Sequence, residues 1–137
     1  MRVVVDTNIL VSFFRLNPVH SIILDCSSLG LELSTPEFSF DELKANLPGL
    51  RKYSGLSDGE LELVELALRS CIEAIPLESF EEYVAAGEKA TPDQKDKLFF
   101  ALALKLNASI WSNEPRLKKQ SSVPVLSTSD MRKLLGV

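Results

Sequence analysis

The sequence predicts one α/β domain spanning residues 1–137, with a mainly parallel sheet of about five short strands and helices on both faces. Three observations predict this fold class. Short apolar segments rich in β-branched residues alternate with longer amphipathic segments. The length is close to that of one typical domain. No repeat, low-complexity tract or long linker divides the chain.

Each element has its own signal. The run at residues 2–5 is β-branched and suits a buried strand, whereas the segment over 93–106 is apolar nearly all round and suits a buried helix. In chain order we expect a strand at 2–5, helices from residue 7 or 8 and over 20–29, a strand at 31–34, helices over 36–47 and 57–71, a strand at 73–76, helices over 79–89 and 93–106, strands at 109–111 and 124–126, and a helix over 129–135.

Local signals set several boundaries. Gly30 ends the helix before it, and Pro36 suits the first position of the next helix, which Pro48-Gly49 would end. Ser57 and Glu60 have the spacing of a capping box, in which two side chains bond to backbone N–H groups at the start of a helix. The expected order of elements therefore depends on capping as well as on periodicity.

The composition is that of an ordinary globular protein, with 45% hydrophobic and 25% charged residues. Cys26 and Cys71 lack the spacing of a zinc site or a disulfide scaffold, so we expect two reduced, buried thiols. Asp6 and Asn8 interrupt the first apolar run before a signal peptide can form, and no stretch approaches the ~18 apolar residues of a membrane helix. We expect a cytoplasmic protein with no membrane segment.

The net charge of −4 argues against a general polyanion binder, since phosphate contacts need Lys and Arg. The charge is uneven along the chain, however. Residues 115–137 hold five basic side chains against Asp130 alone, and these are Arg116, Lys118, Lys119, Arg132 and Lys133. This stretch is either a basic rim that faces a nucleic acid or a solvated basic tail.

Asp6 is the first candidate functional residue, because it follows a buried strand directly. In parallel sheets, ligands bind beyond the carboxyl ends of the strands. Asp is also a good helix cap, so Asp6 has a structural alternative at the start of the helix that follows. Ser112-Asn113-Glu114 occupies the corresponding position after the fourth strand.

Asp96 lies at the start of the apolar helix, one turn after Asp93 on roughly the same face. Both acids would interact favourably with the helix N-terminus, and this alone accounts for Asp93. Asp96 borders the buried run, where an unpaired carboxylate is costly, so it needs a partner. The candidates are a divalent cation, Lys95 and Arg116.

Glu42 and Glu114 would each be ordinary surface acids if taken singly, since most Glu side chains are solvated. They become candidate functional residues if they lie in one cleft with Asp6 and Asp96. Carboxylates gathered in one cleft repel one another and raise their pKa values unless a cation compensates. An oxygen-only ligand set suits Mg²⁺ or Mn²⁺, with water and phosphate completing the coordination.

Four motifs resemble the PIN-domain nuclease family, and in particular VapC-type toxins. They are Val3-Val4-Val5-Asp6-Thr7-Asn8, Phe40-Asp41-Glu42-Leu43, the segment from Asp93 to Ala103, and Ile110-Trp111-Ser112-Asn113-Glu114. Together with the order of strands and helices, the resemblance covers nearly the whole chain.

The resemblance implies a Rossmann-like α/β/α domain that hydrolyses RNA with Mg²⁺ or Mn²⁺ held by an acidic quartet. The residues that match the quartet are Asp6, Glu42, Asp96 and Glu114. Asp93 is a further candidate metal ligand near them. Ser112 matches a residue that helps arrange the water on the metal, and Asn8 matches one that steadies the loop after the first strand.

Glu114 stands where the family usually has Asp, and its longer side chain would reach a metal differently. This departure and the acidic net charge favour an alternative, a PIN-like module with little or no turnover that binds RNA or a protein partner. A further alternative is a phosphotransfer domain with Asp6 as acceptor, similar to haloacid-dehalogenase-like phosphatases, which would want Asp where this chain has Asn8. Metal-dependent cleavage of single-stranded RNA separates the nuclease from the binding module.

The resemblance also implies partners. Toxins of this kind are held inactive by an antitoxin protein, and family members commonly pair as homodimers. Apolar stripes over 61–68 and 80–84 more often face a protein's own core, but small domains also bury helical patches across a two-fold axis. We therefore expect a homodimer whose grooves present Arg116, Lys118 and Lys119 to the RNA backbone.

Overall fold

The computed structural model describes all residues from Met1 to Val137 and contains one wholly parallel sheet in the order β3-β2-β1-β4-β5. The predicted α/β fold class is confirmed. The strands are β1 (Arg2–Val5), β2 (Glu32–Pro36), β3 (Ile72–Ile75), β4 (Ser109–Trp111) and β5 (Val125–Leu126).

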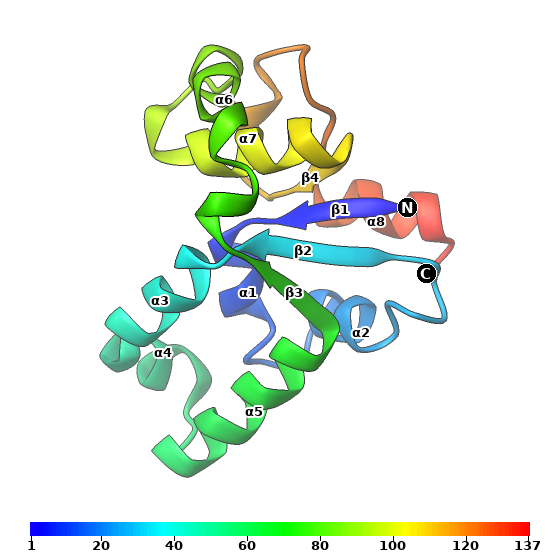
Figure 1. Ribbon diagram of the computed structural model, residues 1–137. Helices are drawn as coiled ribbons and strands as arrows, with labels where there is room; N and C mark the ends of the chain where they lie inside the picture. The colour runs from blue at the N-terminus through cyan, green and yellow to red at the C-terminus, as the bar shows by residue number, and fades with distance from the viewer.

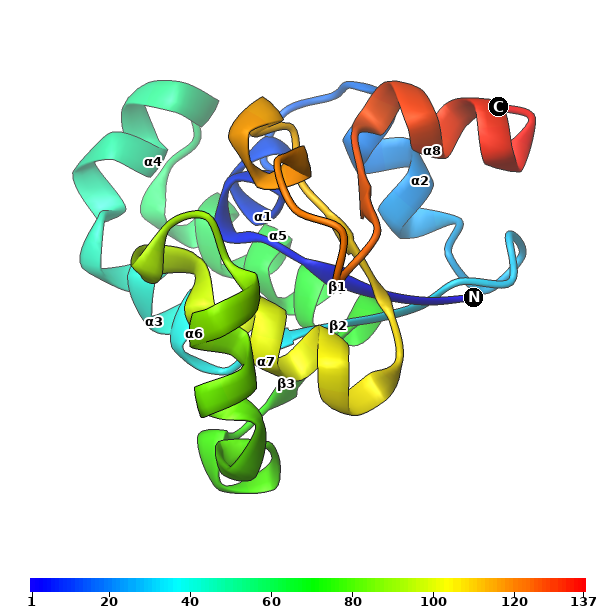
Figure 2. The same ribbon diagram turned by 90° about the horizontal axis from the view of Figure 1, so that it is seen from above.

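Helices cover both faces of this sheet. Figure 1 shows α6 and α7 above the strands, with α1, α2 and α5 below them. The view from above in Figure 2 places the N-terminus and α8 at the same end of the molecule, away from α3 and α4. No helix has the length and apolar content needed to cross a membrane. The helices are α1 (Thr7–Ser12), α2 (Pro18–Leu24), α3 (Phe38–Ala45), α4 (Leu47–Ser54), α5 (Asp58–Cys71), α6 (Val84–Ala90), α7 (Lys97–Leu106) and α8 (Thr128–Leu135).

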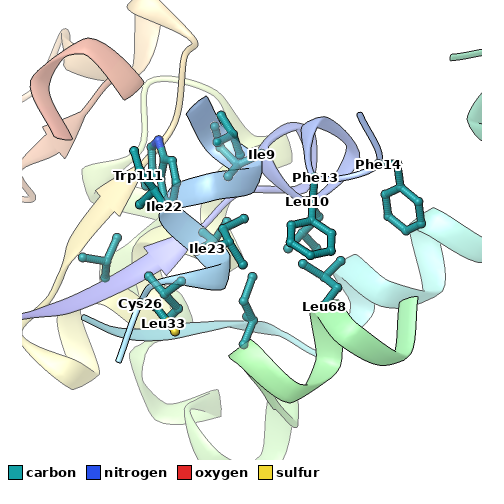
Figure 3. Packing of buried hydrophobic residues seen from close by; sticks show 14 of the residues in the cluster. Ile9, Leu10, Phe13, Phe14, Ile22, Ile23, Cys26, Leu33, Leu68 and Trp111 are labelled. Carbon is teal, nitrogen blue, oxygen red and sulfur yellow. The ribbon is translucent and has the colours of Figure 1, made fainter. Parts of the chain in front are cut away.

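The central strand β1 separates two hydrophobic clusters. Val3 and Val5 belong to a cluster of 20 buried residues, and Val4 belongs to one of 12 on the opposite face. Because successive side chains of a strand point to opposite faces, a strand with a core on each side reads as a continuous apolar run. Figure 3 shows the larger cluster, in which side chains of α1 and α2 pack with Leu68 of α5 and Trp111 of β4.

Two proline positions differ from the sequence-based expectation. Pro36 was expected to begin a helix, but it ends β2 opposite Ile75 of β3, and α3 starts only at Phe38. Pro48 was expected to end a helix, but it lies in the first turn of α4. A proline in the first turn costs no hydrogen bond, because the N–H groups there have no partner within the helix. A proline in the sequence can therefore indicate either the beginning or the end of a helix, depending on the turn in which it lies.

The helices expected over 79–89 and 93–106 begin later than predicted. The short 3₁₀ turns η1 (Leu77–Ser79) and η2 (Glu81–Tyr83) precede α6, and η3 (Gln94–Asp96) precedes α7. By contrast, the capping box at Ser57 and Glu60 forms as predicted at the start of α5, with both reciprocal bonds present. The residues just before α7 form a 3₁₀ turn and not α-helix, and Asp96 is the residue that precedes the first turn of α7.

The topology creates a crevice at the carboxyl ends of β1 and β4. The chain leaves β1 to build β2 and β3 on one side, and later returns to build β4 and β5 on the other side. Side chains directly after β1 and β4 therefore face a gap that no crossover helix fills, which is the usual ligand position in open α/β sheets. Val5 pairs with Trp111, so Asp6 and Ser112 follow at the same level.

Candidate active site

A pocket of about 400 Å³ lies at these strand ends and is lined by all four acids of the predicted quartet. The quartet comes from four separate places in the fold. Its members are Asp6 after β1, Glu42 on α3, Asp96 before α7 and Glu114 after β4. Asn8 also lines the pocket, together with two basic residues, Lys95 and Arg116. The pocket wall is thus strongly acidic, and only two basic side chains offset the negative charge of its four acids.

Asp6 is both a helix cap and a wall of the pocket. Its backbone N–H donates to the carbonyl of Trp111 at 3.2 Å, which holds it against β4. Its Oδ1 accepts from the N–H of Ile9 at 2.9 Å and so caps α1. Only 5% of Asp6 is exposed. Asp6 can therefore serve as a helix cap and as a functional residue at once, because capping uses only one of its two carboxylate oxygens.

The surroundings of Asp6 raise its pKa to about 6. Burial is the largest cause, because removal from water penalises the charged form. Hydrogen bonds from the Ser112 side chain and the Ile9 N–H lower the pKa, whereas the negative charges of Asp96 and Glu114 raise it. A nearby positive charge would stabilise the ionised form of this buried carboxylate.

Glu42 and Glu114 are each held by a residue of the Asp6-Thr7-Asn8 segment. Thr7 Oγ1 donates to Glu42 Oε1 at 2.9 Å, and Asn8 Nδ2 donates to Glu114 Oε1 at 3.2 Å. The start of α1 therefore bridges α3 on one side and the chain after β4 on the other. Asn8, which was expected to steady this loop, makes its contact directly with an acid of the quartet.

Ser112 lies beneath the pocket and does not line it. It is 1% exposed, and its Oγ accepts from the N–H of Glu114 at 3.1 Å. The side chain also bonds to Asp6. Ser112 therefore contacts two acids of the quartet, and its role in this structure is to position them.

Asp96 is the acid with the least satisfied carboxylate. It precedes α7 without making a capping hydrogen bond, and its Oδ2 is buried with no hydrogen-bond partner. Arg116 Nη2 lies 3.3 Å from this oxygen, close enough for an ion pair but without hydrogen-bond geometry. Burial raises the pKa of Asp96, and the charge of Arg116 opposes that rise.

Arg116 contacts three carboxylates at once. Besides Asp96, its Nη1 lies 2.6 Å from Asp93 Oδ2 and its Nε lies 3.6 Å from Glu114 Oε2. Asp93 does not line the pocket. In this arrangement no group of three or more Asp, Glu, His or Cys side chains is placed so that it could hold a metal ion. Asp93, Asp96 and Glu114 lie close together, but their carboxylates are oriented toward the Arg116 guanidinium.

Two of the five basic side chains over residues 115–137 are engaged in ion pairs. Arg116 turns into the pocket, and Lys118 Nζ lies 2.5 Å from Asp130 Oδ2 at the start of α8. Sequence reasoning named Arg116 as one candidate partner of Asp96 but did not foresee its contact with Glu114. It also missed Thr7, whose only signal was its place beside Asp6.

The donor chemistry of the pocket fits a hard divalent cation. Every candidate ligand is a carboxylate oxygen, Asp6 is nearly fully buried, and Asp96 has a buried oxygen without a hydrogen bond. Oxygen ligands of this kind suit Mg²⁺ or Mn²⁺. The carboxylates would need to turn away from Arg116 to reach a common ion, because their present orientation serves the guanidinium.

A protein-family model described as a PIN domain matches residues 4–135, which is nearly the whole chain and includes all four acids of the pocket. The chain belongs to the PIN domain family. PIN domains are generally nucleases and typically use divalent metals, so this PIN domain has a nuclease-type function. No curated protein matches the chain.

Proposed function

We propose that this PIN domain is a Mg²⁺- or Mn²⁺-dependent endoribonuclease that hydrolyses RNA phosphodiester bonds in the acidic pocket. The observation that supports it best is the convergence of Asp6, Glu42, Asp96 and Glu114 in one pocket at the carboxyl ends of β1 and β4. The choice of RNA as substrate comes from the resemblance to VapC-type toxins, and so does a role as the toxin of a toxin–antitoxin pair.

In this mechanism Asp6, Asp96 and Glu114 would hold the cation, and Glu42 lines the same pocket. A bound Mg²⁺ or Mn²⁺ supplies Lewis-acid chemistry, since it polarises a phosphate and lowers the pKa of a bound water. Ser112 and Ile9 orient Asp6 from beneath through their hydrogen bonds. Thr7 fixes the Glu42 carboxylate, so that this side chain enters the pocket from α3 in a set direction. These hydrogen bonds hold the Asp6 and Glu42 side chains at the pocket, and this positioning is what they contribute to the reaction.

The test is cleavage of a labelled single-stranded RNA by the purified protein with Mn²⁺, Mg²⁺ or EDTA, beside a DNA of the same sequence. Asp6→Asn and Asp96→Asn should each lower kcat at least about 100-fold, as loss of one preorganised electrostatic group does in other enzymes. Asp41→Asn is the matched control, because Asp41 is the exposed neighbour of Glu42 and does not line the pocket. Cleavage that survives in EDTA, or in both pocket variants, would refute the proposal.

The second candidate function is a module that binds RNA or a protein partner with little or no turnover. One specific observation favours it, namely the contact of Arg116 with Glu114 and Asp96, which occupies two of the proposed ligands. The same RNA substrate separates the two functions. A binding module would retain the RNA without cleaving it, with or without Mn²⁺, and Asp6→Asn would leave the RNA affinity unchanged.

The antitoxin partner and the homodimer remain part of the proposal. Of the two stripes that the sequence offered for an interface, Leu61, Leu68 and Phe80 are buried in the chain's own core, whereas Val64, Tyr83 and Val84 are half-buried. Light scattering measures the assembly directly. A homodimer gives twice the chain mass of 15.2 kDa, and a mass equal to that of one chain would reject it.

A further inference from the structure

Arg116 has a fixed path into the pocket. Pro115 follows Glu114 and begins the short turn η4 (Pro115–Lys118), and Leu117 in that turn is only 1% exposed. Burial of Leu117 anchors the turn, so the neighbouring Arg116 side chain points back toward the acids. Its guanidinium remains half-buried, with 36% of the side chain exposed. The buried Leu117 therefore places the turn so that the Arg116 side chain can reach the acids.

The guanidinium contacts two of the carboxylates that are proposed to hold the cation. Arg116 Nη2 faces Asp96 Oδ2, and its Nε faces Glu114 Oε2. A divalent cation and a guanidinium carry like charges and repel each other at short distance. Binding of one at Asp96 and Glu114 therefore disfavours binding of the other.

Asp93 stands apart from this competition. Its Oδ2 accepts the shortest of the three Arg116 contacts, 2.6 Å to Nη1, and it lies outside the pocket wall. Its Oδ1 is already held by the N–H of Lys95 at 2.9 Å. Asp93 can therefore keep Arg116 when the other two carboxylates turn away. This assigns Asp93 the role of holding Arg116 and not that of a metal ligand.

We propose that Arg116 is an internal counter-ion that competes with the divalent cation for Asp96 and Glu114, so that the protein restrains its own metal binding. The inference rests on the proposed metal-dependent function. Without metal, the guanidinium neutralises the acids and keeps them from repelling one another. Metal binding requires Asp96 and Glu114 to turn away from the guanidinium, which stays with Asp93. The activity of the domain is then limited at low metal concentration by a residue of the same chain.

The test is titration of the metal-free protein with Mn²⁺ by isothermal titration calorimetry. Arg116→Gln removes the charge at similar length, and we expect its Kd for Mn²⁺ to be about tenfold lower than that of the wild type. The size follows from two partly exposed ion pairs, each able to shift an equilibrium by about threefold. Arg116→Lys keeps the charge but loses the planar fork that serves three acids, so it should tighten Mn²⁺ binding by a smaller factor.

Two controls separate the ion pairs from general electrostatics. Lys95→Gln also removes a positive charge from the pocket wall, but Lys95 is paired only with Asp93, at 3.7 Å. Lys118→Gln removes the neighbouring charge that is paired with Asp130. Both variants should bind Mn²⁺ within about twofold of the wild type. If Lys95→Gln tightens binding as much as Arg116→Gln, net charge is the cause and the inference is overturned.

Thermal unfolding gives an independent readout. In EDTA, Arg116→Gln should melt below the wild type, because Asp96 and Glu114 lose their counter-charge. With saturating Mn²⁺ its rise in Tm should exceed that of the wild type. If Arg116→Gln does not fold without metal, Arg116→Lys takes its place in both measurements. Equal Mn²⁺ affinity of wild type and Arg116 variants overturns this inference alone, whereas absence of Mn²⁺ binding in all of them overturns the metal-dependent function as well.

Discussion

Replacing Asp6 by Asn should raise the stability of the metal-free protein at neutral pH. The folded-state pKa of Asp6 is about 6, whereas an unfolded Asp titrates near the ordinary value of 3.8. Because the folded pKa lies above the unfolded one, the folded state binds more protons between these values, and stability falls as pH rises through this window. Above about pH 6 the folded protein carries a buried charge that it does not favour, and Asn removes that charge.

The magnitude follows from the shift. A difference of about two pKa units corresponds to roughly 3 kcal/mol, and 5% exposure leaves little solvent to screen it. Asn keeps an oxygen that can accept from the Ile9 N–H, and Asn is as good a helix cap as Asp, so the capping bond to α1 is retained. Some of the gain is offset because Ser112 and Ile9 bond less strongly to an amide than to a carboxylate. We expect a gain of about 1–3 kcal/mol at neutral pH.

Differential scanning calorimetry in EDTA measures this over a pH series. For a domain of this size, 1 kcal/mol corresponds to roughly 4 °C in Tm, so the variant should melt between about 4 and 12 °C higher near pH 7. The difference should shrink below about pH 6 and vanish below about pH 3, where the carboxyl group is protonated in both states. Asp41→Asn, on the exposed face of α3, should show no such gain. An Asp6→Asn variant that is less stable than wild type at neutral pH would mean that its charge stabilises the helix more than burial penalises it.

Three further predictions concern the scaffold of the site. A Cβ at Gly87 would lie 2.5 Å from the carbonyl oxygen of Lys97, so Gly87→Ala should push α6 away from α7. We expect it to lower the free energy of unfolding by about 1–3 kcal/mol in chemical denaturation. Gly59→Ala is the control, because a Cβ at Gly59 meets open space and should not lower stability. Ser57→Ala removes one arm of the capping box of α5 and should cost about 1 kcal/mol, measured in the same way. Asp130 has its pKa lowered to about 2, first by the hydrogen bond from Lys118, so Asp130→Asn should be less stable than wild type above about pH 4, and the difference in Tm should disappear as pH falls to about 2.

The sequence contains most of the information for the fold because the buried elements have a simple composition. Val3, Val4 and Val5 face a core on each side, so their run reads as a strand without reference to the rest of the chain. The positions of Asp6 and Glu114 followed from the same logic, since strand ends of a parallel sheet meet at one edge. Turn chemistry was harder to read. Pro36 and Pro48 are compatible with two local structures each, and only pairing with β3 or docking of α4 decides between them.

The arrangement of the candidate site could be predicted only in part. Which acids gather depends on topology, and the motifs carried that information. How their oxygens point depends on single contacts between residues far apart in the chain, such as Thr7 with Glu42 and Arg116 with Asp93. No periodicity encodes the direction of a side chain on a short 3₁₀ turn. The role of Arg116 therefore became visible only with the distances.

The position of β1 in the sheet has a consequence for the timing of the site during synthesis. β1 comes first in the chain but needs β2 on one side and β4 on the other, and Asp6 is bonded to Trp111. At a translation rate of about 5–20 residues per second, Asp6 is made roughly 5–20 s before Glu114. Long-range pairing of this kind also folds late, because the ends of a long loop must first meet. A chain whose synthesis has not yet reached Glu114 therefore carries no complete acidic pocket.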